Sequence, residues 1–135
     1  MPLLNTAPVG DFSASAASES EYESFENVTA TFQWPSPIGL YVPQLPNLCF
    51  YGLFGTDNGT TTVTITPQMS LSSGTGGGTT PVPIYLDLAG ATVLPLGTPV
   101  LLNYYFPAVL IRFNITIAGA APDCDMQLAI GAYGG

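Results

Sequence analysis

Residues 109–117 read VLIRFNITI, and this stretch decides the fold class. Every odd position in it is apolar, while Arg112, Asn114 and Thr116 lie on even positions. A period of two is typical of a β-strand that buries one face. The stretch therefore predicts a strand whose odd-numbered side chains enter a core and whose other face carries Arg112.

The same alternation recurs through most of the chain. Further alternating segments are residues 27–34, 63–71, 82–88, 100–106 and 126–132. Residues 48–54 are apolar on both faces, which predicts a strand covered on both sides. No segment has a convincing helical period. Seven or eight short strands separated by Gly and Pro predict an all-β protein, an antiparallel β-sandwich of Greek-key or jelly-roll type.

Three local signals refine this expectation. Asn58-Gly59 favours the positive φ angles of a tight hairpin turn. Pro67 cannot donate to a sheet ladder, so it predicts an edge strand or a bulge. The buried parity changes at Pro107, which predicts a bulge or a corner there.

The N-terminal segment differs from the rest in composition. Residues 1–26 hold five of the nine acidic residues and an Ala/Ser tract at 13–20. Such a composition is typical of a mobile tail or an extended arm. We therefore expect an acidic, Ser/Ala-rich N-terminal arm over residues 1–26 and a β-sandwich domain over residues 27–135.

Basic side chains are nearly absent: the chain has one Arg, no Lys and no His, and a formal net charge of −8. Binding to nucleic acid or to an anionic membrane requires clusters of Lys and Arg, so neither partner is expected. A Ser or Cys nucleophile needs a base, usually His or Lys. The composition thus argues against an enzyme and predicts no catalytic residue.

Carboxylates are the remaining reactive groups. Asp123 and Asp125 share a face in an extended chain, and a carboxylate pair can flank a glycosidic bond. Together with Asp57 and Asn58 they offer oxygen ligands for Ca²⁺. The favoured interpretation is that they are turn residues bonded to their own backbone. We accordingly predict no cofactor and no metal.

The two cysteines, Cys49 and Cys124, are too few for a disulfide framework. Cys49 lies in an apolar run, where a free thiol packs as a small hydrophobe. A Cys49–Cys124 disulfide is the alternative.

Met1-Pro2-Leu3-Leu4 lacks the basic start of a secretion signal, and no apolar run is long enough to span a bilayer. We expect synthesis in a cytoplasm without export by the general secretory route.

A surface poor in ions and rich in apolar side chains is typical of protein contacts, so a large interface is expected. Glu19, Glu21 and Glu23 alternate and would line one edge of the extended arm. Arg112 is expected to pair with a carboxylate on a neighbouring strand, such as Asp125 or Asp87, or with a carboxylate from the acidic arm of another subunit. The candidate interface residues are Glu19, Glu21, Tyr22, Glu23, Phe25, Tyr105 and Arg112.

The acidic arm, the β-domain and the Thr/Gly/Pro-rich surface together resemble structural proteins of tailed-bacteriophage virions, closest to the small decoration (cement) proteins of capsids. The resemblance implies a homo-oligomer bound to the major capsid protein or other virion proteins, in a virion assembled in the host cytoplasm. A tail, fibre or head-completion protein would look similar. The alternative is a carbohydrate- or ligand-binding β-sandwich, with stacking faces from Trp34, Tyr104, Tyr105 and Tyr133.

Overall fold

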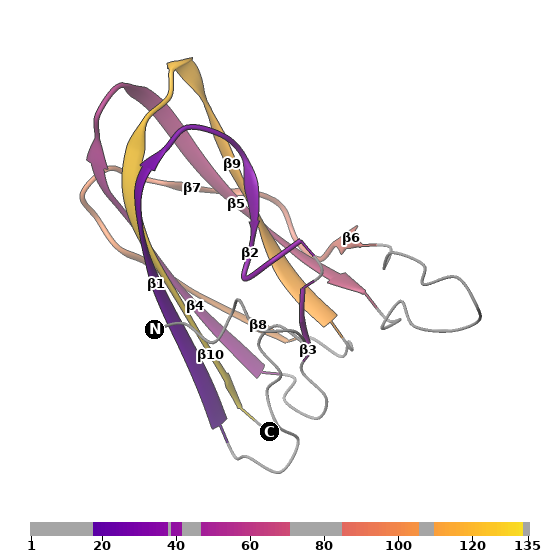
Figure 1. Ribbon diagram of the computed structural model, residues 1–135. Coiled ribbons are helices and arrows are strands. Elements are labelled where there is room, and N and C mark those ends of the chain that lie inside the picture. The colour runs from indigo at the N-terminus through magenta and orange to yellow at the C-terminus, as the bar shows by residue number, and fades with distance from the viewer. Residues whose placement is uncertain (1–17, 38, 42–46, 71–84, 106–109, 134–135) are drawn as a thin grey trace.

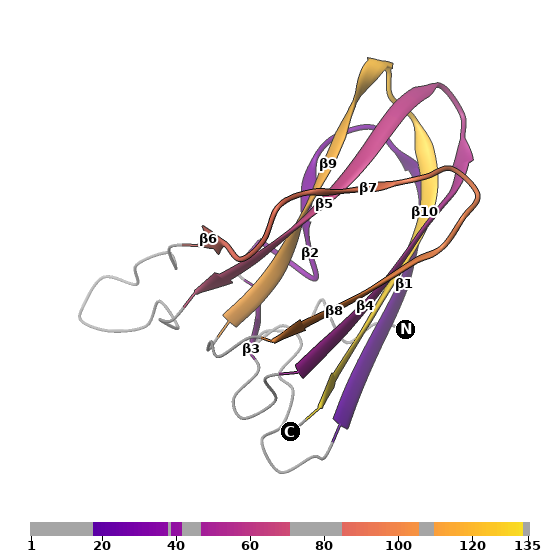
Figure 2. The ribbon, with the colours of Figure 1, turned by 180° about the vertical axis from the view of Figure 1, so that it is seen from behind.

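The computed structural model describes residues 18–37, 39–41, 47–70, 85–105 and 110–133. Ten β-strands and no helix occur within these ranges. The strands form two antiparallel sheets packed face to face (Figures 1 and 2). This arrangement confirms the predicted antiparallel β-sandwich. Within the described part of the chain, no helix has the length and hydropathy needed to span a bilayer.

Sheet A has four strands in the order β1–β10–β4–β8. Their bounds are Ser18–Val28 for β1, Cys124–Tyr133 for β10, Asn47–Asp57 for β4 and Val100–Tyr105 for β8. β10 is the last strand in the chain, yet it lies between β1 and β4 and pairs with both.

Sheet B is built on the long pair β5 (Thr60–Ser70) and β9 (Leu110–Ala121). Four short strands flank this pair. β2 (Phe32–Trp34) and β3 (Leu40–Tyr41) pair with β9, while β6 (Leu86–Asp87) and β7 (Thr92–Leu94) pair with β5.

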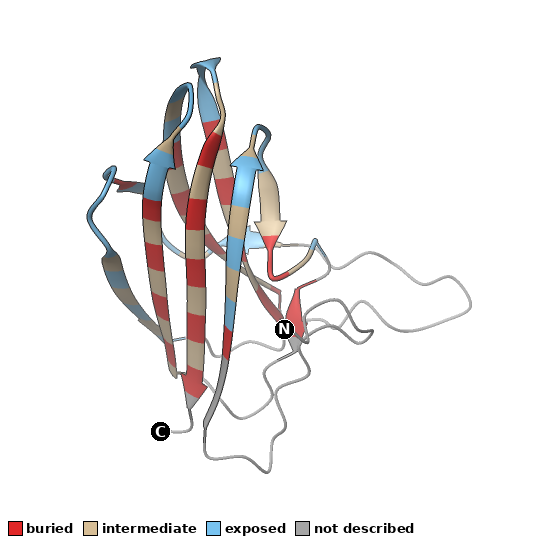
Figure 3. Cartoon of the chain, turned by 60° about the vertical axis from the view of Figure 1, so that its left-hand side comes forward, coloured by how far each residue is buried: buried red, intermediate tan, exposed pale blue. Residues whose placement is uncertain are grey.

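The core lies between the sheets, where the buried side chains alternate along each long strand (Figure 3). Odd positions of β5 and β9 and even positions of β4 and β10 face inward. At the centre, the ring of Phe50 lies 4.5 Å from that of Phe113 and 6.4 Å from that of Trp34. The inward parity predicted for 111–117 and 126–132 is therefore confirmed, because burial fixes the register of strands with one core face.

Two chain connections cross between the sheets at the same end of the sandwich. β4 passes to β5 through Asn58-Gly59, and β9 passes to β10 through Pro122-Asp123. The two turns are joined by a 2.7 Å hydrogen bond from the Asn58 N–H to the Asp123 carbonyl. The turn at Asn58-Gly59 is thus present, but the predicted hairpin is wrong, since β4 and β5 belong to different sheets.

Pro67 lies in β5, which is an interior strand and not the predicted edge. The predicted bulge is also not found there, because the pairing of β5 with β9 is continuous from Thr62 to Ser70. β7 pairs with residues 63–65 of β5, and β6 pairs with residues 68–69. Pro67 falls between these two short partners and its carbonyl accepts a 2.8 Å bond from the Leu88 N–H. Because N and O of one residue point to the same side in an antiparallel strand, the missing N–H faces this gap and β9 loses no bond.

The acidic segment also differs from expectation. Residues 18–26 form most of β1 and pair with β10, so the sandwich includes them and does not begin at residue 27. Residues 1–17 of the expected arm lie outside the described residues. The single strand expected over 27–34 is interrupted, because Asn27 adopts φ 53° and the chain crosses from sheet A to sheet B before β2.

The strand expected over 82–88 is reduced to β6, and residues 82–84 lie outside the described residues. Leu86, expected in the core, is 61% exposed. The parity change expected at Pro107 also lies outside the described residues.

Candidate protein-docking face

The two sheets present outer faces of opposite character. The outer face of sheet B is mainly polar, with hydroxyl and amide side chains, Arg112 and Asp87, and it also carries Val93, which is 58% exposed. Its residues on β5 and β9 are Thr62, Thr64, Thr66, Gln68, Arg112, Asn114 and Thr116. Such a face is suited to contact with water.

The outer face of sheet A carries aromatic and aliphatic side chains over most of its area, and its described charges, Glu26 and Asp125, lie at the end next to the crossing turns. We define the A face as the uncharged part of this surface away from those turns: Tyr22, Ser24, Asn47, Cys49, Tyr51, Leu53, Leu101, Asn103, Tyr105, Gln127, Ala129 and Gly131.

The strand register arranges these side chains in rows across the sheet. Tyr22 is opposite Ala129, Ala129 is opposite Tyr51, and Tyr51 is opposite Leu101. Leu101 and Tyr105 on β8 are 63% and 64% exposed, and Tyr22 on β1 is 52% exposed. Burying the exposed part of one such side chain contributes roughly 1–2 kcal/mol. The A face can therefore drive association by apolar burial without an ion pair.

Sequence reasoning missed most of this face, although a signal was present. Residues 48–54 were expected to be covered on both sides, and the structure places one side in the core and the other on the A face. No described element of this chain covers that second side. Tyr51 and Leu53 are the residues that this signal could have identified.

The interface residues predicted on β1 divide into two groups. Tyr22 lies on the A face, where its hydroxyl is 3.0 Å from that of Ser24. Glu21, Glu23 and Phe25 point toward the sandwich interior: Glu21 is buried, Glu23 accepts a 2.9 Å bond from Trp34 Nε1, and Phe25 packs on Phe32. Glu19 pairs through its backbone with Ala132, and its side chain lies outside the description. Glu21 and Glu23 therefore do not form an exposed acidic strip along one edge of the arm.

Arg112 lies on the outer face of sheet B, far in the fold from Tyr105. Its Nε–H donates to Gln68 Oε1 at 2.8 Å, its Nη1 donates to the Pro37 carbonyl, and its guanidinium carbon lies 4.0 Å from the Tyr85 ring centroid. Burial lowers the pKa of Arg112 and raises that of Tyr85 to about 12.

The expected ion pair of Arg112 is not formed with a described carboxylate. Gln68 stands between, because its Nε2 donates to Asp87 Oδ1 at 2.9 Å. The guanidinium of Arg112 therefore contacts the side-chain amide of Gln68, the carbonyl of Pro37 and the ring of Tyr85, and these contacts stabilise sheet B.

The crossing turns gather the carboxylates that were considered as a catalytic pair or a calcium site. Asp123 Oδ1 accepts from Asn27 Nδ2, and Asp125 Oδ1 accepts from the Asn27 N–H and from Asn58 Nδ2. Asp57 accepts from the N–H groups of Gly59 and Thr61, and these bonds lower its pKa against the opposing effect of desolvation. Within the described residues, no group of three or more acidic, Cys or His side chains is arranged to hold a metal. The carboxylates thus act as acceptors that fix the turns.

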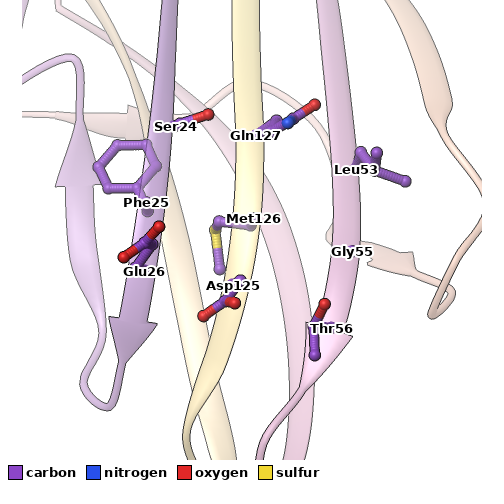
Figure 4. A pocket seen from close by; sticks show the side chains of 9 residues that line it. All are labelled: Ser24, Phe25, Glu26, Leu53, Gly55, Thr56, Asp125, Met126 and Gln127. Atoms are coloured by element: carbon purple, nitrogen blue, oxygen red, sulfur yellow. The ribbon is translucent and has the colours of Figure 1, made fainter.

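A pocket of about 250 Å³ opens beside these turns, between β1, β10 and β4 (Figure 4). It lies where both strand pairs of β10 shift register, near Phe25 and between Asp125 and Met126. Glu26 and Asp125 are its charged residues. The Oδ1 atom of Asp125 accepts bonds from Asn27 and Asn58, which ties this carboxylate to the crossing turns.

The cysteines are both free, Cys49 on the A face and Cys124 buried. The alternative disulfide is therefore wrong for this fold. Cys124 is opposite Asp57 on β4. Asp57 is eight residues from Cys49 on the same strand, which is about 26 Å. A disulfide requires Cα atoms within about 7 Å. Burial and the nearby Asp57, Asp125 and Asp123 raise the pKa of the Cys124 thiol to about 11.

The expected sugar-stacking residues are mostly inaccessible. Trp34 is 2% exposed, and Tyr104 faces inward with its ring 6.0 Å from that of Phe113. The side chain of Tyr133 lies outside the description, which leaves Tyr105.

The fold defines the chain as an antiparallel β-sandwich protein. Comparison with known proteins found solved structures that share this fold. No family model matches the sequence, and no curated protein matches it. Among solved structures, the PBSX exported protein XepA superposes with a TM-score of 0.58 at 14% identity, covering 95% of this chain. The chain spans 40% of the length of that protein.

Two weaker likenesses were found. A Bacillus endospore appendage protein, from disulfide-linked pili, has a TM-score of 0.47 at 16% identity, with 93% of this chain and 99% of that chain covered. The CBM22-1–GH10 modules of a Clostridium thermocellum endo-1,4-β-D-xylanase give 0.45 at 14% identity, with 87% and 25% covered.

Proposed function

We propose that this chain is a non-enzymatic structural protein of a viral particle, a decoration (cement) protein that binds the shell through its A face. The observation that carries the proposal is the contrast between the two sheets. Sheet B turns Thr, Asn and Gln outward, while sheet A turns Tyr51, Leu53, Leu101 and Tyr105 outward. A sheet face without charges and with exposed aromatic side chains fits a protein partner better than water.

The mechanism is linkage by mass action. A protein that binds the assembled shell and not its free subunits shifts the equilibrium toward the intact particle. Specific attachment requires a total buried area of about 1,000 Å² or more. The A face crosses all four strands of sheet A, so it offers a surface broad enough to approach that area. The partner is the major capsid protein or another virion protein, and the location is the virion.

The net charge of −8 is compatible with this mode of attachment. The described acidic residues lie on β1, at the crossing turns and on β6, outside the A face as defined above. Glu26 and Asp125 line a pocket with Ser24, Leu53 and Gln127, so a partner docked on the A face has these two carboxylates at the border of the contact. The likeness to the PBSX exported protein XepA concerns the fold.

The test is incorporation into particles. We expect the chain to band with particles from its own source in a density gradient, and the variant Leu101→Glu to be lost from the band. Thr64→Glu, on the outer face of sheet B, is the matched control and is expected to remain. Absence of the wild-type chain from every particle band would refute the proposal, and equal incorporation of both variants would refute the role of the A face.

A carbohydrate-binding module is the second candidate, because Tyr22, Tyr51 and Tyr105 lie together on the A face. Exposed tyrosines can stack on sugar rings. Glycan-array binding that is lost in Tyr105→Ala and kept in Tyr85→Phe would favour this candidate over the structural role.

A further inference from the structure

Among the described residues, the edge strand β8 is uncharged and pairs with a neighbouring strand on one side only. It runs over Val100–Tyr105 and bonds to β4, and it ends the strand order of sheet A. Its sequence VLLNYY contains no charge, no Pro and no Gly, and its pairing with β4 shows no register shift. An exposed edge of this kind presents unpaired N–H and C=O groups to another strand.

The other edges in the described part of the chain are protected. β1, at the opposite edge of sheet A, carries Glu19, Glu21, Glu23 and Glu26. Glu21 and Glu23 point inward, and the pairing shifts between Phe25 and Val28. Sheet B ends in strands of two or three residues. Inward charges, bulges and short strands all prevent edge pairing, so β1 and the short outer strands of sheet B are protected by devices that β8 lacks.

We infer that β8 pairs antiparallel with β8 of a second copy about a two-fold axis at Asn103, joining two A sheets into one eight-stranded sheet. This inference deepens the proposed function, because it names a partner for the open side of the A face. A two-fold axis requires a surface that is its own complement. Centred on Asn103, the pairing sets Leu101 opposite the partner's Tyr105, which joins two of the most exposed apolar side chains across the new ladder.

The charge distribution selects a second copy as the occupant. Two chains of net charge −8 repel unless their acidic groups stay apart. β1 lies three strand spacings from β8, about 14 Å, beyond the Debye length of about 8 Å at physiological salt. Asp125 also lies away from β8. It is opposite Thr56 on β4, and Thr56 is four residues beyond Gly52, which is opposite Val100, the first residue of β8. Two copies can therefore meet at the β8 edge without carboxylates facing each other, and this edge offers a basic partner no carboxylate to bind.

The side-chain pair at the axis gives a direct test. Opposed residues of an antiparallel pair have Cα atoms about 4.5–5.5 Å apart, within the range of a disulfide. We therefore expect Asn103→Cys, in a Cys49→Ser background, to form a disulfide-linked dimer rapidly on mild oxidation. Ser24→Cys in the same background is the matched control, because it is exposed on the same face beside the protected edge. It is expected to cross-link at least about tenfold more slowly.

A second variant tests the uncrosslinked protein. The chain of 14.0 kDa is expected to sediment with twice that mass, and Asn103→Lys to weaken the dimer about tenfold or more by placing two ammonium groups at the axis. Asn58→Lys, at the crossing turns, should leave the mass unchanged. Circular dichroism and thermal unfolding verify that each variant is folded.

The outcomes separate this inference from the proposed function. A monomeric wild type, or equal cross-linking rates for the Asn103→Cys variant and the Ser24→Cys control, would overturn the β8 dimer. Particle incorporation by such a monomer would leave the proposed function standing. A β8 dimer that no particle contains would support the dimer and refute the proposed function.

Discussion

The bond between Trp34 and Glu23 makes a quantitative prediction about how the two sheets are held together at the β1 edge. Trp34 belongs to sheet B and Glu23 to sheet A, and Nε1 lies 2.9 Å from Oε1. Trp34 is 2% exposed, so water cannot replace a lost acceptor. A buried donor left unpaired costs about 1–3 kcal/mol, and a bond to a charged group contributes about 1.5–3 kcal/mol.

We therefore expect Glu23→Ala to lower the free energy of unfolding by about 2 kcal/mol, which corresponds to a fall in Tm of about 8 °C for a domain of this size. Glu23→Gln keeps an acceptor oxygen but loses the charge, and we expect about half that loss. The assay is chemical denaturation followed by tryptophan fluorescence, since the chain has a single Trp.

Glu26→Ala is the matched control, because Glu26 lies on the same strand with its side chain exposed. Its effect is expected to stay within about 0.5 kcal/mol. If Glu23→Ala and Glu26→Ala unfold at the same denaturant concentration, the bond contributes nothing and the inward orientation of Glu23 is wrong.

Two further predictions concern the crossing turns. Asn27→Ala should lower the free energy of unfolding by about 1–2 kcal/mol, because Ala loses the side-chain bond to Asp123 and is strained at φ 53°. Asn27→Gly loses the same bond but tolerates this φ, so it should cost less. Thermal unfolding of both variants tests this, and equal losses would contradict the backbone argument. Cys124 has a folded pKa of about 11 against an ordinary value of about 9, so the folded state holds its proton more tightly. The stability from this effect is fully present below pH 9 and is lost as the pH rises toward 11. In Cys124→Ala, the free energy of unfolding should therefore fall less steeply with pH across this range. An unchanged slope of that free energy against pH would refute this cause.

The sequence predicted the parts of the fold that burial determines locally. In β9 and β10, alternation between apolar and polar side chains fixed which residues enter the core, and Ile115 and Leu128 are fully buried as expected. Sheet membership was not predictable in this way. Asn58-Gly59 favours a tight turn whether the next strand pairs with the previous one or crosses to the other sheet.

The N-terminal segment shows a second limit. Its acidic composition is typical of a solvated arm, yet β1 is fixed by contacts with residues far along the chain. Glu23 finds Trp34, and Asn27 finds Asp123 and Asp125 at the other end of the described sequence. No local pattern encodes such partners. The docking face was predictable in part, because residues 48–54 were apolar on both sides and the composition indicated an interface.

The place of β10 between β1 and β4 has a consequence for synthesis. Ribosomes release this strand after the other nine described strands, so until then neither β1 nor β4 has its β10 partner. Sheet A therefore cannot close before Tyr133 has been made, and its speed of closure is governed by the search that brings β1 and β10 together.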